Sequence, residues 1–320
     1  MTLPSDTPPR ILFMGTPDFA VPSLRALADA GLCPIAVATA PDRKRGRGQT
    51  FSPTPVKQAA QELGIETILT PEDVKDPVFA GHVRSLGVDV MVVVAFRILP
   101  EAVFSASRLG TFNLHGSLLP AYRGAAPINR AIMAGEAETG VTTFFLKQKV
   151  DTGNIIMKHS MPIGANETAG EVHDRMIRLG AEVVVETTRR ILDGTAEAQP
   201  QDDSQASPAP KIFRDDCRID WTQSAEQVHN LIRGVSPVPG AFTRYGGKQL
   251  KIFRSRMREG TGTSVQPGTI LSVEPDLTVA AGSGTVILDE VQMEGRQRVS
   301  AVDFVNGHHP STGTVLGHDG

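Results

Sequence analysis

Three polar side chains in the middle of the sequence have types that could act together on a carbonyl group. Asn113 and His115 end a short apolar run, and Asp151 follows later in the turn sequence Val150-Asp151-Thr152-Gly153. Residues two apart on a strand point to the same face, so the amide and the imidazole are expected side by side. An amide donor, an imidazole and a carboxylate suit the transfer of an acyl group to an amine.

Each of these residues has an expected role in such a transfer. Asn113 would donate to the carbonyl oxygen, and a protonated His115 would stabilise the oxyanion of the tetrahedral intermediate. Asp151 would set the state of His115 and relay protons through water between the attacking amine and the leaving nitrogen. No nucleophile is required, and no Ser or Cys lies in an elbow motif such as GxSxG.

The predicted elements place this trio at the edge of an open α/β sheet. Residues 88–95, VDVMVVVA, are apolar and β-branched almost throughout, which is typical of a central parallel strand. Ligands of such sheets bind at the carboxyl ends of the strands, so the sequence predicts a doubly wound, mostly parallel α/β domain with its site there. Strands are predicted at 11–14, 35–39, 65–69, 88–95, 111–114 and 141–146, and helices at 21–30, 56–63, 74–86, 125–133 and 167–192.

The strand, glycine turn and helix at the start of the chain also resemble a dinucleotide-binding unit. However, Gly15-Thr16-Pro17-Asp18-Phe19 lacks the second and third glycines of GxGxxG, which let a pyrophosphate approach the backbone. Nicotinamide or flavin binding is therefore not favoured.

A basic segment follows the second predicted strand. Four of the five residues from 43 to 47 are basic, and prolines and glycines flank them, which indicates an exposed, mobile loop rather than a helix or strand. The loop could be merely solvated, or it could contact a nucleic-acid backbone. The basic residues are Arg43, Lys44, Arg45 and Arg47.

The composition changes after residue 194. Residues 195–210 are rich in Gln, Asp, Ser and Pro without an apolar period, which is typical of a linker. From Lys211 onward the chain predicts one helix, 225–232, and short strands around Gly-rich turns, which favours a small β-barrel. The predicted domains are therefore 1–194 and 211–320. The second contains a stripe of six basic residues and no acidic one: Arg244, Lys248, Lys251, Arg254, Arg256 and Arg258. The stripe fits contact with phosphates, or protection of a β-edge by charge.

Composition limits the remaining function classes. A net charge of −3 and 21% charged residues describe an ordinary globular protein, so any nucleic-acid surface must be local. The two cysteines, Cys33 and Cys217, have no partner at zinc-ligand spacing, and no metal site is predicted. The first residues lack the apolar core of a signal peptide, and no run of about 18 apolar residues could span a membrane. We expect a cytoplasmic protein, and a monomer.

The longest motifs resemble those of a known family. NLHGSLLPAYRGAAPI at 113–128, followed by DTG at 151–153, resembles the signature of the formyltransferases that use 10-formyltetrahydrofolate. GTPDF at 15–19 and PDRKRGRG at 41–48 resemble the branch of this family that acts on initiator methionyl-tRNA. RIDW at 218–221 and PGTIL at 267–271 carry the match into the second half.

The resemblance implies a fold, a donor, an acceptor and site residues. It implies an OB-like barrel after the α/β domain, 10-formyltetrahydrofolate as formyl donor, and initiator methionyl-tRNA as acceptor. The family's Asn, His and Asp fall on Asn113, His115 and Asp151. Its folate-contacting residues fall on Ser117, Leu118, Leu119 and Pro120. Backbone groups at Phe96, Arg97 and Ile98 would hold the pterin, although this segment departs from the commoner family form, in which an aromatic-glycine pair and an extra residue precede Leu-Pro. The residues expected to contact tRNA are Arg43, Lys44, Arg45, Arg47, Lys211, Arg244, Lys248, Lys251 and Arg254.

Other functions remain open at this point. A formyltransferase acting on a small amine, such as a ribonucleotide or a sugar nucleotide, would share the Asn, His and Asp but not the basic PDRxxGRG segment. A non-catalytic nucleic-acid-binding module would use the barrel and the basic segment alone. Tyr122-Arg123-Gly124 could be a structural turn in which Arg123 pairs with a local carboxylate, or it could take part in catalysis.

Overall fold

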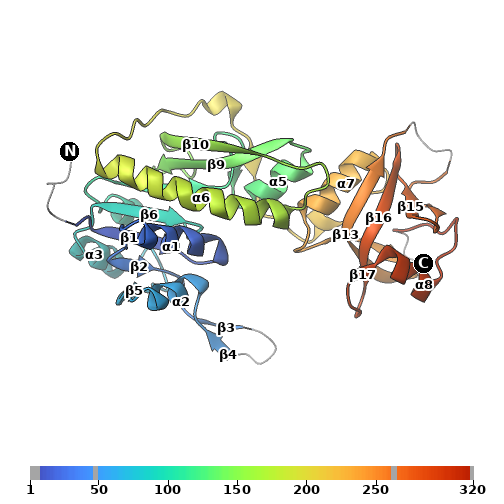
Figure 1. The fold of residues 1–320 in the computed structure, drawn as a ribbon, viewed down its shortest axis with the longest axis horizontal. Coiled ribbons are helices and arrows are strands. Elements are labelled where there is room, and N and C mark those ends of the chain that lie inside the picture. The colour runs from blue at the N-terminus through green and yellow to red at the C-terminus, as the bar shows by residue number, and fades with distance from the viewer. Residues whose placement is uncertain (1–7, 46–49, 261–264, 318–320) are drawn as a thin grey trace. The chain divides into compact units, whose positions relative to one another are not determined.

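A computed structural model describes residues 8–45, 50–260 and 265–317 (Figure 1). The chain divides into two compact units. The first unit holds the described residues up to 124 together with 140–161 and 174–208, and the second holds 125–139, 162–173 and the described residues from 209 onward. The domain boundaries given above remain a prediction.

The first unit is built on a mostly parallel sheet. Its strands run in the order β10-β9-β7-β6-β1-β2-β5, with parallel pairing from β7 through β6, β1 and β2 to β5, and antiparallel pairing between β7 and β9. The predicted parallel α/β architecture is confirmed. The bounds are β1 Ile11–Gly15, β2 Ala36–Ala38, β5 Thr67–Leu69, β6 Val90–Val94, β7 Gly110–His115, β9 Glu138–Phe145 and β10 Ile155–Pro162.

The order of the strands fixes where a ligand can bind. The chain moves from β1 outward to β2 and β5, then returns to β6 on the other side of β1. The carboxyl ends of β1 and β6 therefore flank the switch point, where open α/β sheets bind ligands. Gly15, at the end of β1, leaves no room for a side chain. A Cβ on this residue would lie 2.7 Å from the Ala20 Cβ and 3.0 Å from the Val94 carbonyl oxygen.

Helices cover the sheet and begin where the sequence provides caps. Thr54 and Asp76 accept backbone N–H groups of α2 and α3, and each precedes a proline at the first helical position. Gly180 in the longest helix permits close packing, because a Cβ there would lie 2.8 Å from the Leu114 side chain on β7. The helices are η1 Asp18–Ala20, α1 Val21–Asp29, α2 Pro55–Glu62, α3 Pro77–Ser85, α4 Glu101–Phe104 and α6 Ala169–Leu192.

Two segments differ from the sequence prediction. The basic segment is not a loop throughout, because β3 Arg43–Arg45 pairs antiparallel with β4 Thr50–Ser52 and so forms the first strand of a hairpin. Arg and Lys residues have little preference for a strand by themselves, and pairing with residues 50–52 stabilises the strand at 43–45. The second segment is β10, which no sequence pattern indicated, because it is an edge strand whose Lys, His and Ser residues interrupt the apolar pattern.

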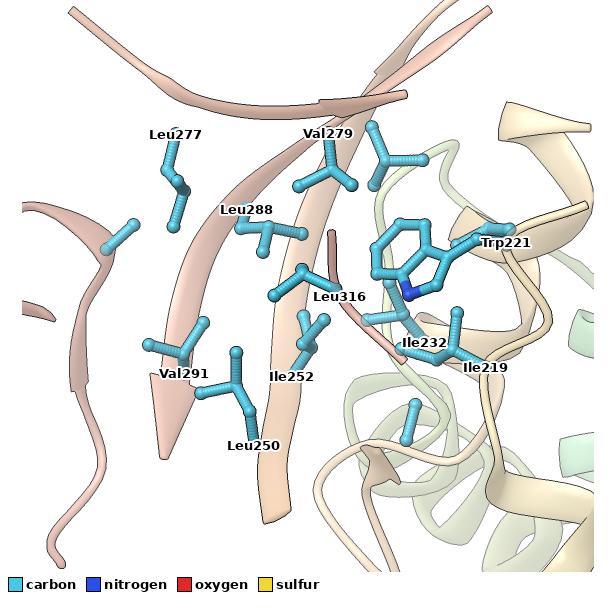
Figure 2. Packing of buried hydrophobic residues seen from close by; sticks show 14 of the residues in the cluster. Ile219, Trp221, Ile232, Leu250, Ile252, Leu277, Val279, Leu288, Val291 and Leu316 are labelled. Carbon is cyan, nitrogen blue, oxygen red and sulfur yellow. The ribbon is translucent and has the colours of Figure 1, made fainter. Parts of the chain in front are cut away.

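The second unit is built on an antiparallel sheet that forms a half-barrel. Its strands run in the order β12-β13-β16-β15-β14, and β17 pairs with β16. Figure 2 shows Leu250, Ile252 and Leu288 of this sheet in one apolar cluster with Trp221 and Ile232. The elements are α5 Pro127–Met133, η3 Asp215–Cys217, α7 Ala225–Gly234, β12 Ala241–Tyr245, β13 Lys248–Arg258, β14 Ile270–Ser272, β15 Leu277–Ala280, β16 Thr285–Met293, β17 Val299–Ser300 and α8 Ala301–His308.

Residues 195–210, predicted as a linker, are ordered against the first unit as far as residue 207. Gln199 exchanges both backbone hydrogen bonds with Ile155. Three short elements belong to this segment and its partners: β8 Arg123–Gly124, η2 Asp203–Gln205 and β11 Pro208–Ala209. Within the described ranges, no helix has the length and apolar character needed to cross a membrane.

Candidate active site

The predicted catalytic residues meet at the end of β7. Asn113 and His115 lie on this strand with one residue between them, so both side chains project from the same face. His115 is buried, and its Nδ1 lies 3.9 Å from Asp151 Oδ2. Asp151 belongs to the turn between β9 and β10, and β9 pairs directly with β7. The fold therefore brings together an imidazole and a carboxylate that are 36 positions apart in the sequence.

The partners of the His115 ring define its tautomer. His115 Nε2 lies 2.8 Å from the Tyr122 carbonyl oxygen. A carbonyl oxygen can only accept, so Nε2 carries a proton. Nδ1 then faces Asp151 Oδ2, beyond direct hydrogen-bond distance. The imidazole is thus held at one nitrogen and faces a carboxylate at the other.

Two turns meet around this histidine. The Gly124 N–H donates to Asp151 Oδ2 over 3.0 Å, which joins the turn at 122–124 to the turn at 151–153. Tyr122 has φ +61° and Asp151 has φ +55°, in the left-handed region that non-glycine residues rarely adopt. Such conformations cost on the order of 1 kcal/mol or more each and are held in place by their surroundings.

The segment that follows α6 supplies those surroundings. Gln201 Nε2 donates to the carbonyl oxygens of Asp151, over 2.9 Å, and Gly153, over 2.8 Å. Gln201 Oε1 accepts from Arg123, whose guanidinium also pairs with Asp203 at 2.7 Å. The hydrogen bond from Arg123 lowers the pKa of Asp203. Arg123 therefore pairs with a local carboxylate, which was one of the two roles expected for it.

Ser207 completes the contacts to the turn at 122–124. Its Oγ accepts the Tyr122 N–H over 2.9 Å, and its carbonyl oxygen accepts the Arg123 N–H over 2.8 Å. Gln201 and Ser207 were not among the predicted site residues, because a polar segment without periodicity gives no sign of which side chains turn inward. One general indication was available: the backbone N–H and C=O groups of the turns at 122–124 and 151–153 need hydrogen-bond partners from elsewhere in the chain.

The four residues expected to contact folate form a turn fixed by β9. Thr142 Oγ1 donates to the Ser117 carbonyl oxygen over 2.7 Å and accepts the Leu119 N–H over 3.0 Å. Ser117 and Leu119 are fully buried, whereas Leu118 is half-buried. The peptide bond from Leu119 to Pro120 is cis. Leu118 is thus the only one of these four residues that is not buried.

The segment at 96–98 follows β6 at the switch point. Arg97 extends away from it and donates to the carbonyl oxygens of Glu72, over 2.8 Å, and Pro71, over 2.7 Å. Burial lowers the pKa of the Arg97 guanidinium. Phe96 is half-buried and Ile98 is 69% exposed. Arg97 thus ties this segment to the preceding loop of the first unit.

The basic hairpin is attached firmly at its base. Thr39 and Thr54 share a hydrogen bond of 2.7 Å, and Lys57 pairs with Asp42 at 2.6 Å. Arg43 is exposed on β3. Lys44 and Arg45 follow on the same strand, and Arg47 lies outside the described residues.

The basic stripe of the second unit is partly neutralised by carboxylates that the linear sequence does not place beside it. Arg254 pairs with Glu171 and Glu290, and Arg256 pairs with Asp276 and Asp289. Glu290 and Asp289 lie on β16, the strand paired with β13. Lys251 Nζ donates to the Pro239 carbonyl oxygen, and Arg244 Nη1 to that of Gly247. The remaining predicted residues, Lys211 and Lys248, are exposed.

In the parts of the chain that the structure describes, no group of three or more His, Cys, Asp or Glu side chains could hold a metal ion.

Comparison with known families identifies this arrangement. The family model described as "Formyl transferase" matches residues 9–188, and that described as "Formyl transferase, C-terminal domain" matches residues 211–309. The chain belongs to the formyltransferase family, and it is an enzyme of the one-carbon transferase class.

Its relatives within the family carry a more specific name. Methionyl-tRNA formyltransferase of Chlorobium luteolum is 54% identical over 306 residues, which cover 94% of this chain and 97% of the relative. The enzyme of the same name from Geobacter metallireducens is 45% identical, over 96% of this chain and 98% of the relative. A solved N-formyltransferase from Helicobacter canadensis, in complex with folinic acid and dTDP-3-aminofucose, shares the fold with a TM-score of 0.67 at 20% identity, over 89% of this chain and 100% of that chain.

Proposed function

We propose that this enzyme transfers the formyl group of 10-formyltetrahydrofolate to the α-amino group of methionine on initiator methionyl-tRNA, for translation initiation. The observation that carries the proposal is the meeting of His115 and Asp151 at the carboxyl end of β7, with Asn113 on the same strand face. The names of relatives at 54% and 45% identity support the acceptor.

The geometry supports a direct transfer with no covalent enzyme intermediate. The methionine amine attacks the formyl carbon, a new C–N bond forms, and the bond from the formyl carbon to N10 of the folate breaks. Asn113 donates to the formyl oxygen as it becomes an oxyanion, and His115, when protonated, stabilises the same charge. Asp151 accepts the amine proton through water and returns a proton toward N10, so protons balance over the cycle.

The folate would bind at the switch point of the sheet. The turn of Ser117, Leu118, Leu119 and Pro120 lies after β7, and Phe96, Arg97 and Ile98 lie after β6, so both flank the proposed catalytic residues. Because Arg97 is engaged with the loop at 71–72, we assign pterin contact in the 96–98 segment to its backbone. We propose that no metal takes part.

The tRNA would contact basic residues of both units. These are Arg43, Lys44, Arg45 and Arg47 of the hairpin region, with Lys211, Arg244, Lys248, Lys251 and Arg254 of the second unit. Among them, Arg254 is ion-paired, so we expect it to contribute less than the exposed Lys248. We also propose that the half-barrel is OB-like, as expected for a domain that helps hold RNA. The cytoplasmic location and the monomeric state remain predictions.

The test is a formyl-transfer assay with 10-formyltetrahydrofolate and four acceptors: methionyl initiator tRNA, methionyl elongator tRNA, glycinamide ribonucleotide and a dTDP-linked amino sugar. We expect selective transfer to the initiator tRNA. Transfer only to a small amine would keep the catalytic residues and refute the proposed acceptor. No transfer to any acceptor, with retained affinity for tRNA, would favour the non-catalytic binding module.

A matched pair of variants tests the chemistry. Asp151→Asn should fold normally and lower turnover by about two to four orders of magnitude, which is the usual range for loss of acid–base catalysis. Asp193→Asn, an exposed position after α6, should leave turnover unchanged. A near-normal rate in Asp151→Asn would refute the role proposed for this carboxylate.

A further inference from the structure

We propose that Gln201 is a positioning residue for formyl transfer, which fixes both groups that face the His115 ring. This inference rests on the proposed function, because it takes Asp151 and His115 to be catalytic. Gln201 lies outside the residues matched by the family model, which end at 188, in the segment whose composition predicts a linker.

The Gln201 carboxamide uses its full capacity for hydrogen bonds. A carboxamide has two N–H donors and two acceptor positions. The donors are directed to the carbonyl oxygens of Asp151 and Gly153, and Oε1 accepts from Nε, over 3.2 Å, and Nη2, over 2.6 Å, of Arg123. The orientation of the amide is unambiguous, because the carbonyl groups only accept and the guanidinium only donates.

These bonds join the two turns that define the surroundings of His115. The turn at 122–124 supplies the Tyr122 carbonyl oxygen that accepts from His115 Nε2. The turn at 151–153 supplies the carboxylate that faces Nδ1. Gln201 holds the second turn directly and the first through Arg123. Gln201 therefore braces both partners of the imidazole, alongside the direct hydrogen bond from the Gly124 N–H to Asp151.

Both turns need such support, because each contains a non-glycine residue in the left-handed region. Tyr122 and Asp151 would move toward the common regions of φ if the hydrogen bonds were lost. Movement of Asp151 would carry its carboxylate away from His115. A displacement of about 1 Å in a catalytic group can reduce the rate about a hundredfold.

A carboxamide is the only common side chain of this length that can make all four bonds. Gln201→Met keeps the length and loses every donor and acceptor. Gln201→Glu keeps the acceptor for Arg123 and places a carboxylate oxygen against two carbonyl oxygens. Gln199→Met is the matched control, because Gln199 lies two residues away in the same segment, has an exposed side chain and pairs with Ile155 through its backbone.

The experiment measures kcat, the KM of each substrate and thermal unfolding for these variants of the full chain. We expect Gln201→Met and Gln201→Glu to lower kcat about a hundredfold, with KM for both substrates changed less than about threefold. We expect the Gln199→Met control to match the native enzyme. A kcat within about threefold of the control in both Gln201 variants would overturn the proposal.

A double-mutant cycle separates positioning from a general loss of stability. If Gln201 acts through Asp151, adding Gln201→Met to Asp151→Asn should slow the enzyme little further, because the group being positioned is already lost. A further hundredfold loss in the double variant would overturn the proposal. If Gln201→Met unfolds at the assay temperature, the same cycle with Gln201→Glu decides.

The cycle also distinguishes this inference from the proposed function. A native rate in Asp151→Asn would refute both. A strongly impaired Asp151→Asn beside an unimpaired Gln201→Met would refute only the role of Gln201.

Discussion

Gly153 lies so close to Phe145 that a Cβ on residue 153 would be 1.5 Å from the Phe145 carbonyl oxygen. The Phe145 N–H donates to the Asn154 carbonyl oxygen over 3.0 Å, which closes the same turn. The turn that carries Asp151 is therefore packed directly on the end of β9, and β9 is paired with the strand that carries His115. The absence of a side chain at 153 allows the turn that carries Asp151 to lie against the end of β9.

Gly153→Ala should lower both turnover and stability, because the backbone must move to admit the Cβ. We expect a loss of at least about tenfold in kcat, by displacement of Asp151, and a destabilisation of about 1–3 kcal/mol, as for other overpacked sites. Steady-state kinetics and denaturant unfolding measure the two effects. Gly81→Ala on α3 is the control, because a Cβ there meets no atom within 4 Å and alanine is favoured over glycine inside a helix by about 1 kcal/mol. Equal behaviour of the two variants would contradict the packing argument.

Arg97→Met should weaken binding of the folate without changing the chemical step. The Arg97 guanidinium holds the segment after β6 against the carbonyl oxygens of Pro71 and Glu72. Without it, the backbone proposed to hold the pterin loses its support, so KM for the folate should rise several-fold while kcat stays the same. Arg84→Met, at an exposed position on α3, is the control. An unchanged folate KM would count against pterin contact at 96–98.

Glu171→Gln should change how stability depends on pH. The hydrogen bond from Arg254, together with those from Thr168, lowers the pKa of Glu171 from 4.5 to about 2. A carboxyl group whose pKa is lower in the folded state stabilises the fold above its unfolded pKa, and this contribution is lost as pH falls from about 4.5 to about 2. The side chain is 43% exposed, so solvent screening limits the effect to about 1 kcal/mol or less.

Unfolding free energies measured from pH 7 to pH 3 check this expectation. The native protein should exceed Glu171→Gln in stability at pH 7, and the difference should narrow below pH 4.5. Glu182→Gln, exposed on the same helix, should show no such narrowing. A difference that stays constant down to pH 3 would exclude the Arg254 pair as its source.

Lys248→Gln and Arg254→Gln should affect tRNA binding differently. Removal of one cation that binds a phosphate should reduce the slope of log K against log salt concentration by about 0.7 to 0.9. Lys248 is exposed, whereas Arg254 already pairs with Glu171 and Glu290. We therefore expect the full change in slope for Lys248→Gln and a smaller one for Arg254→Gln, measured by titration at several salt concentrations. Equal changes would mean that tRNA displaces the two carboxylates.

The sequence predicted the parts of this fold whose information is local. The run at 88–95 gives β6, and the apolar strand ending at His115 gives β7, because buried parallel strands need nearly continuous apolar residues. The proposed catalytic trio was identified by its residue types and by a long motif. His115 and Asp151 lie 3.9 Å apart in the structure, and their roles in catalysis stay a prediction.

The parts that were missed depend on partners distant in sequence. The strand at 43–45 exists because 50–52 pairs with it, and β10 exists because β9 offers an edge. The stripe from Arg244 to Arg258 contains no acid, yet two of its cations are paired across the sheet, Arg254 with Glu290 and Arg256 with Asp289. The contacts of Gln201 could not be predicted from its neighbours in sequence. All four of its side-chain hydrogen bonds are to residues about 50 and about 80 positions away.

The segment from Gln199 to Ser207 also affects where a functional fragment of the first unit should end. The matched catalytic family region stops at residue 188, whereas the first compact unit continues to residue 208. A fragment cut at the end of the match would retain Asn113, His115 and Asp151 but would lose the side chains that hold the turns around them. Any transplant of this part of the chain into another protein should therefore extend through Ser207, although residues 189–207 contain none of the proposed catalytic groups.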